Sequence, residues 1–114
     1  MSLQGTCREN GGVAIVDFSG RITLGEATGM VRAMVRELAD SGQKKILLNL
    51  ADVDYIDSAG IGELVSVFTT VRNAGGELKL LNLTKRVVDL LQITRLYTVF
   101  DVQTEEWTAI HGFK

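Results

Sequence analysis

Short apolar runs and amphipathic stripes alternate along the first half of the chain. Val13 to Phe18 is rich in β-branched and aromatic residues, which favours a strand, and Ser19-Gly20 is expected to end it. Thr23 and Glu26 fit a capping box, in which each side chain accepts a hydrogen bond from a backbone N–H at the start of a helix. The helix that they predict carries one apolar stripe, made of Leu24, Ala27, Val31, Met34, Val35 and Leu38.

The same alternation continues to the carboxyl end. Further strands are expected over residues 46–50, 78–83 and 99–102, and further helices near Ser58, Thr84 and Thr104. The run over 46–50 is almost entirely apolar, which is typical of a central strand covered on both faces. Alternation of this kind predicts an α/β domain with a mixed sheet of four or five strands and about four helices. A strand before Gly11 is left open as the fifth.

The length predicts one domain, because 114 residues is a usual size for a single domain. This domain is expected to cover residues 1–114, with residues 1–10 partly flexible or left over from cloning. Trp107 and Ile110 are expected to dock the last helix onto the rest of the fold.

Composition and charge narrow the function. The hydrophobic fraction of 46% suits a packed core, and a formal net charge of -2 disfavours a nucleic-acid binder, which needs an excess of Lys and Arg. Cys7 and His111 are the only cysteine and histidine, so neither an internal disulfide nor a structural zinc site is expected, and no cofactor is expected either. No apolar run approaches the roughly 18 residues of a membrane span. A cytoplasmic protein without membrane insertion is therefore expected.

Candidate chemistry lies at the junction of residues 52–62, which follows the most apolar strand. In open α/β sheets, function concentrates where strands end and helices begin. Asp57 or Ser58 can cap the second helix, and capping alone would explain a serine there. Gly60 and Gly62 fall in the first turns of that helix, where each costs about 1 kcal/mol relative to alanine. They indicate either a bare surface that another backbone approaches or tight packing of helix on strand.

Residues 57–62, with the sequence DSAGIG, resemble the signature of the STAS-domain anti-sigma-factor antagonists. Residues 44–50, 74–80 and 19–23 resemble the family's central strand, its helix–turn–strand and its first strand–helix loop. The resemblance implies a STAS-like single domain in which an anti-sigma factor that is also a serine kinase phosphorylates Ser58. The unphosphorylated form would bind this kinase and release the sigma factor. The phosphorylated form would let go, and a metal-dependent serine phosphatase would reset the switch.

The resemblance also implies a surface that binds the partner. It would consist of Asp57, Ala59, Gly60, Ile61 and Gly62, joined by Arg21 and Thr23 from a loop that should lie near Ser58. Two positions depart from the family pattern. Many members carry an acidic residue where Thr23 stands, and often Ser or Thr where Ala59 stands. Ser58 is therefore the only hydroxyl in the motif.

Two alternative functions compete with this interpretation. A serine hydrolase needs G-x-S-x-G, but Ile56 occupies the place of the first glycine, and the only histidine lies near the carboxyl end. No phosphate-binding loop of the G-x-x-x-x-G-K-[ST] type occurs, so an enzyme is not expected. Within the family, the chain could instead be a STAS scaffold, or a regulatory subunit of a stress-signalling or lipid or anion transport complex. The motif does not separate these roles from the switch.

Overall fold

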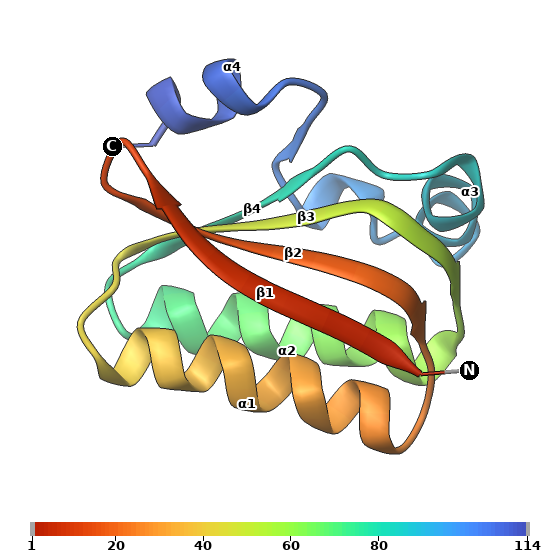
Figure 1. Ribbon diagram of the computed structural model, residues 1–114. Helices are drawn as coiled ribbons and strands as arrows, with labels where there is room; N and C mark the ends of the chain where they lie inside the picture. The colour runs from red at the N-terminus through yellow and green to blue at the C-terminus, as the bar shows by residue number, and fades with distance from the viewer. Residues whose placement is uncertain (1, 114) are drawn as a thin grey trace.

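The computed structural model describes residues 2–113; Met1 and Lys114 lie outside the described residues. Its elements, in chain order, are β1 (Leu3–Asn10), β2 (Val13–Ile22), α1 (Glu26–Asp40), β3 (Lys45–Ile56), α2 (Ser58–Asn73), β4 (Glu77–Leu81), α3 (Lys85–Ile93), a 3-10 turn (Tyr97–Val99), β5 (Val102–Gln103) and α4 (Glu106–His111). Figure 1 shows this arrangement. The predicted α/β class and the number of helices are confirmed.

The five strands form one mixed sheet in the order β1-β2-β3-β4-β5. β1 runs antiparallel to β2, and the remaining neighbours are parallel. The strand left open before Gly11 is therefore present. Residues 3–10 were expected to be partly flexible, but they form β1. The whole of β1 pairs with β2, from Leu3 opposite Gly20 to Asn10 opposite Val13.

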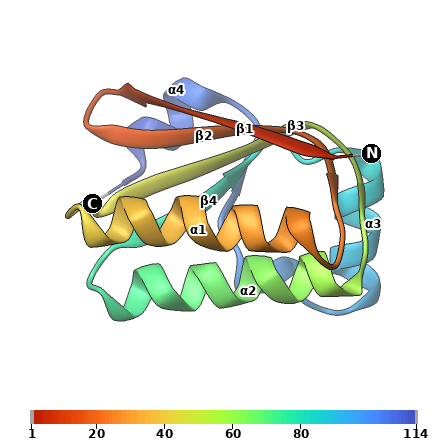
Figure 2. The ribbon, with the colours of Figure 1, turned by 60° about the horizontal axis from the view of Figure 1, so that its bottom comes forward.

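Helices cover both faces of the sheet. α1 and α2 lie side by side on one face, α4 lies on the other, and α3 lies beyond the end of β3 (Figures 1 and 2). Ile46 and Leu48 belong to the main core under α1 and α2, whereas Leu47 packs with Ala109 and Phe113 on the α4 side. All three residues of β3 are fully buried, because a strand alternates its side chains between the two faces. The predicted doubly covered central strand is confirmed.

The start of α1 differs from the prediction. Ser19-Gly20 does not end β2, which continues to Ile22 with two shifts in its register against β3. The helix begins only at Glu26, where the Gly25 N–H donates to Thr28 Oγ1 at 3.1 Å. The predicted capping pair of Thr23 and Glu26 is therefore wrong, because the longer strand moves the helix start towards the carboxyl end.

The last elements also differ. β5 covers residues 102–103 in place of 99–102, because Tyr97–Val99 form the 3-10 turn. Glu105, not Thr104, precedes α4 as its N-cap residue. Trp107 is 66% exposed and stacks on His111, so it does not dock this helix. Ala109 and Phe113 are buried there in its place, with Ile110 packed against them. No helix within residues 2–113 is long and apolar enough to cross a membrane.

Candidate functional site

Asp57 is the N-cap of α2 and links the start of this helix to the loop after β2. Its backbone is extended, with φ -103° and ψ -178°, and its Oδ1 accepts a hydrogen bond from the Gly60 N–H at 2.8 Å. Its Oδ2 accepts a second one from the Leu24 N–H at 3.1 Å. Both carboxylate oxygens are thus used by backbone donors, one from α2 and one from the loop after β2. Asp57 closes the helix and holds that loop beside it.

Ser58 is the first residue of α2 and does not cap the helix. Its side chain is exposed, and no hydrogen bond from its hydroxyl occurs among residues 2–113. The interpretation of Ser58 as a cap alone is wrong, because Asp57 performs the capping. The hydroxyl is accessible to another molecule at the amino end of a helix, where the helix dipole favours negative charge.

The two motif glycines have different surroundings. A β-carbon on Gly60 would lie 2.3 Å from the Ile22 carbonyl oxygen and 2.6 Å from Ile56 Cγ1. Gly60 is therefore explained by tight packing of α2 on the end of β2, one of the two readings of the sequence. A β-carbon on Gly62 would meet no atom within 4 Å, and Gly62 is exposed. Only Gly62 leaves a bare surface.

The remaining motif residues divide between core and surface. Ile61 is buried in the main core, and Ala59 is half-buried beside Ser58. Thr23, half-buried, accepts a hydrogen bond from the Thr28 N–H at its carbonyl oxygen. Gly60 and Ile61 are thus placed to shape the site from inside, and a partner could reach Ala59 and Gly62 directly.

A shallow groove of about 290 Å³ opens beside Ser58. It is lined by Tyr55, Ile56, Asp57, Ser58, Arg86, Asp89, Leu90 and Ile93. Ile93 is 77% exposed, and Leu24, whose N–H is bonded to Asp57, is 79% exposed. Both are large apolar side chains exposed to solvent, and both belong to segments that border the start of α2.

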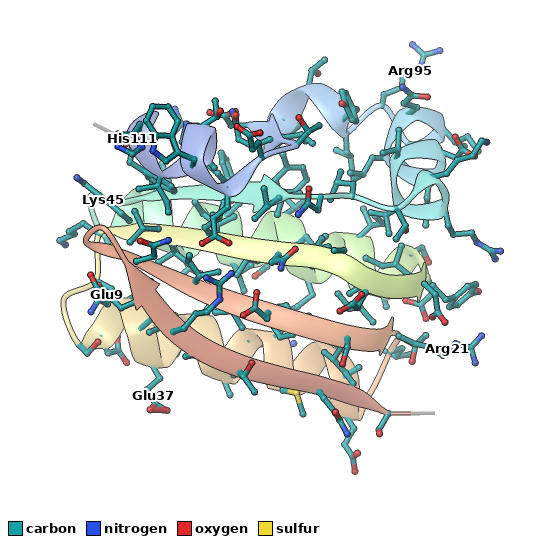
Figure 3. The ribbon with its side chains drawn as sticks, turned by 45° about the horizontal axis from the view of Figure 1, so that its top comes forward. Glu9, Arg21, Glu37, Lys45, Arg95 and His111 are labelled. Carbon is teal, nitrogen blue, oxygen red and sulfur yellow. The ribbon has the colours of Figure 1, made fainter. Side chains whose placement is uncertain are left out.

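Two arginines stack on the aromatic ring of Tyr55. The guanidinium carbon of Arg21 lies 4.7 Å from the ring centroid and that of Arg86 lies 4.6 Å from it. Figure 3 shows Arg21 at the end of the sheet opposite His111. Arg21 lies in the last part of β2 and not in a loop, but its contact with Tyr55 places it near the groove that Ser58 lines, as the sequence predicted. Arg86 was missed, since it follows in α3 and only the fold brings it to this place.

Comparison with known proteins identifies the fold family. The sequence model of the STAS domain matches residues 6–109. This chain belongs to the STAS family. The STAS chain is 32% identical over 105 residues to the anti-sigma-B factor antagonist of Bacillus subtilis, covering 92% of this chain and 94% of that protein.

Solved structures agree on the STAS fold. An anti-sigma factor antagonist from Mycobacterium paratuberculosis superposes with a TM-score of 0.82 at 16% identity, covering 96% of this chain and 92% of that one. The Bacillus cell fate determinant SpoIIAA in its phosphorylated form superposes with a TM-score of 0.72 at 18% identity, covering 95% and 97%. At these identities the likeness concerns the fold.

The STAS site offers a hydroxyl without the groups that would make it a nucleophile. His111 lies on α4, at the other end of the sheet from Arg21 (Figure 3). Within the described part of the chain, no group of three or more His, Cys, Asp or Glu side chains could hold a metal ion. Among residues 2–113, no hydrogen bond joins the Ser58 hydroxyl to a side chain that could activate it.

Proposed function

We propose that this STAS protein is an anti-sigma-factor antagonist that changes partners when Ser58 is phosphorylated. The unphosphorylated form binds an anti-sigma factor and releases the sigma factor, and so regulates transcription. The anti-sigma factor is itself a serine kinase. It transfers the γ-phosphoryl group of ATP to Ser58 Oγ, the hydroxyl proton is released, and ADP leaves. The observation that carries this proposal is an exposed hydroxyl at the start of α2 that the fold itself does not use.

The proposed switch changes partner binding and leaves the fold intact. Phosphoserine adds about -1.5 to -2 charge at neutral pH. The start of a helix tolerates negative charge, and no intramolecular hydrogen bond of Ser58 has to break. A partner packed over Ser58 would have to desolvate the phosphate, which is costly when the partner itself supplies no cation to pair with it. Phosphorylation therefore dissociates the partner while the fold stays intact.

The partner surface that we propose surrounds Ser58. Leu24 and Ile93 supply exposed apolar area, and Ala59 and Gly62 supply a flat approach to the helix start. Arg21 borders it from the end of β2, and Thr23 borders it from the loop after β2. Asp57, Gly60 and Ile61 position this surface: Asp57 through its two backbone hydrogen bonds, and Gly60 and Ile61 through their burial.

A metal-dependent serine phosphatase is the partner that returns the protein to its unphosphorylated form. The protein itself acts by binding and is not an enzyme. The alternative is a constitutive STAS scaffold, whose partner would bind regardless of the state of Ser58. The two roles differ in one measurable property, the dependence of partner binding on phosphorylation.

Phosphorylation by the cognate kinase tests the site. Incubation with that kinase and ATP should add one phosphate, located at Ser58 by mass spectrometry, and Ser58→Ala should abolish it. Ser66→Ala is the matched control, because Ser66 is an exposed serine on the same helix, and it should be phosphorylated like the parent. A phosphate found instead on Thr23, Thr69 or Thr84 would overturn the assignment.

A further inference from the structure

The groove beside Ser58 contains one cation that is not neutralised. Arg86 lines this groove together with Ser58, Asp57 and Asp89. Asp89 pairs with Lys85 at 2.8 Å, one helical turn away. Both oxygens of Asp57 accept from backbone N–H groups. Asp54 lines a neighbouring pocket with Arg86 and Tyr55. No carboxylate among residues 2–113 forms an ion pair with Arg86, so its charge is available to an anion that enters the groove.

The fold holds Arg86 in this place. Thr84 Oγ1, just before α3, donates to the Val53 carbonyl oxygen at 2.9 Å and fixes the start of the helix against β3. The Arg86 guanidinium then lies over the Tyr55 ring, with its carbon 4.6 Å from the ring centroid. A contact of this kind with an aromatic ring leaves guanidinium N–H groups free to donate. Arg86, Tyr55 and Ser58 line the same groove, so these donors belong to the groove that Ser58 lines.

We infer that Arg86 is the internal receptor for the phosphate on Ser58. This inference rests on the proposed function, because it takes Ser58 as the modified residue. Arginine and phosphate form charge-assisted, often bidentate hydrogen bonds, about twice as strong as neutral ones. The phosphate turns into the groove and binds Arg86, and the partner then meets a filled groove in place of an open one. Phosphorylation thereby closes the apolar approach along Ile93 as well as adding charge.

The direct test is the titration of the phosphate itself, followed by phosphorus NMR on the full chain. Phosphoserine is placed at position 58 during translation, so that no kinase is needed. Free phosphoserine has its second pKa near 6. Pairing with Arg86 should hold this pKa lower, and Arg86→Gln should raise it by about half a unit, the size expected of a partly exposed ion pair. Arg36→Gln, at an exposed arginine of α1 away from the groove, should leave it unchanged.

Two outcomes of this titration would overturn the inference. If Arg86→Gln titrates like the parent, the inference is wrong. If Arg21→Gln raises the pKa and Arg86→Gln does not, the phosphate binds the other arginine on Tyr55, and the assignment is overturned. Thermal melting of each variant verifies that it is folded. Failure of the kinase to modify Ser58 would overturn the proposed function but leave this titration interpretable, so the two failures are distinguishable.

Discussion

Gly60 and Ile22 touch backbone to backbone: a β-carbon on Gly60 would lie 2.3 Å from the Ile22 carbonyl oxygen. This contact sets the distance between the start of α2 and the end of β2. The strands β2 and β3 end together, with Ile22 opposite Ile56, so the loop after β2 arrives beside the first turn of α2. The position of Ser58 therefore depends on a glycine that no partner can touch.

The two motif glycines should respond oppositely to alanine. Gly60→Ala forces the helix away from β2 and should lower the free energy of unfolding by about 1–3 kcal/mol, the usual cost of overpacking. Gly62→Ala enters open space in a helix and should raise it by up to about 1 kcal/mol, through helix propensity. Urea unfolding of both variants measures the difference. Equal stabilities would show that the close contact with Ile22 is not present in solution.

Alanine substitutions of Asp57 and Ser58 should also change the unfolding free energy by clearly different amounts. Asp57→Ala removes the cap and the link to the Leu24 N–H, and should cost about 1–2 kcal/mol in unfolding free energy. Ser58→Ala should change it by less than about 0.5 kcal/mol, because no bond is lost. Asp57→Asn is the finer control: its amide oxygen can still accept from Gly60, but its nitrogen cannot accept from Leu24. A loss for Ser58→Ala as large as for Asp57→Ala would return the capping role to Ser58.

The attachment of α4 should be sensitive to acid. Hydrogen bonds from Arg8 join β1 to Asp17 and to Glu106 at the start of α4, and hold the pKa of both carboxyls below the usual range. A carboxyl with a lowered pKa stabilises the fold above its unfolded pKa, and this stabilisation is lost as the pH falls through the folded value. Stability should therefore fall below about pH 4.5, the region where free carboxyls titrate.

Substitution of Arg8 tests whether its hydrogen bonds cause this acid sensitivity. Arg8→Gln should reduce the slope of unfolding free energy against pH between about pH 5 and pH 2, because Asp17 and Glu106 would titrate closer to their unfolded values. Lys79 lowers the pKa of Asp101 by a separate hydrogen bond, so part of the acid sensitivity should remain. A slope identical to that of the parent would show that the Arg8 pairs do not contribute in solution.

The alternation of elements was readable from the sequence, and the ends of several elements were not. Residues 46–50 could be recognised as a doubly covered strand because every side chain there except Asn49 is apolar. The length of β2 could not be predicted, since Ser19-Gly20 resembles the end of a strand. Pairing with β1 on one side and β3 on the other keeps these two residues in the strand. Trp107 was expected to be buried for its apolar ring, but the inward side of the short α4 is taken by Ala109 and Phe113.

The sequence predicted the motif around Ser58 but not the residues of α3 that surround it. Local spacing located Ser58 at a helix start, because caps and glycines have local preferences. It could not decide between Asp57 and Ser58 as the cap, since both residue types favour that position. Arg86 and Ile93 lie far along the chain on α3 and have no local signal that relates them to Ser58. Their contribution follows from the tertiary packing of α3 against the end of β3.

The central claim is that phosphorylation of Ser58 controls partner binding, and one calorimetric comparison tests it most directly. The cognate kinase, with a nonhydrolysable nucleotide to prevent turnover, is titrated with the parent protein and with protein carrying phosphoserine at position 58. Desolvation of the phosphate charge at the interface should weaken binding by about 100-fold or more, which is nearly 3 kcal/mol. Thermal melting of the two forms should be nearly the same. Equal affinity of the two forms would contradict the account and leave the protein a constitutive STAS scaffold.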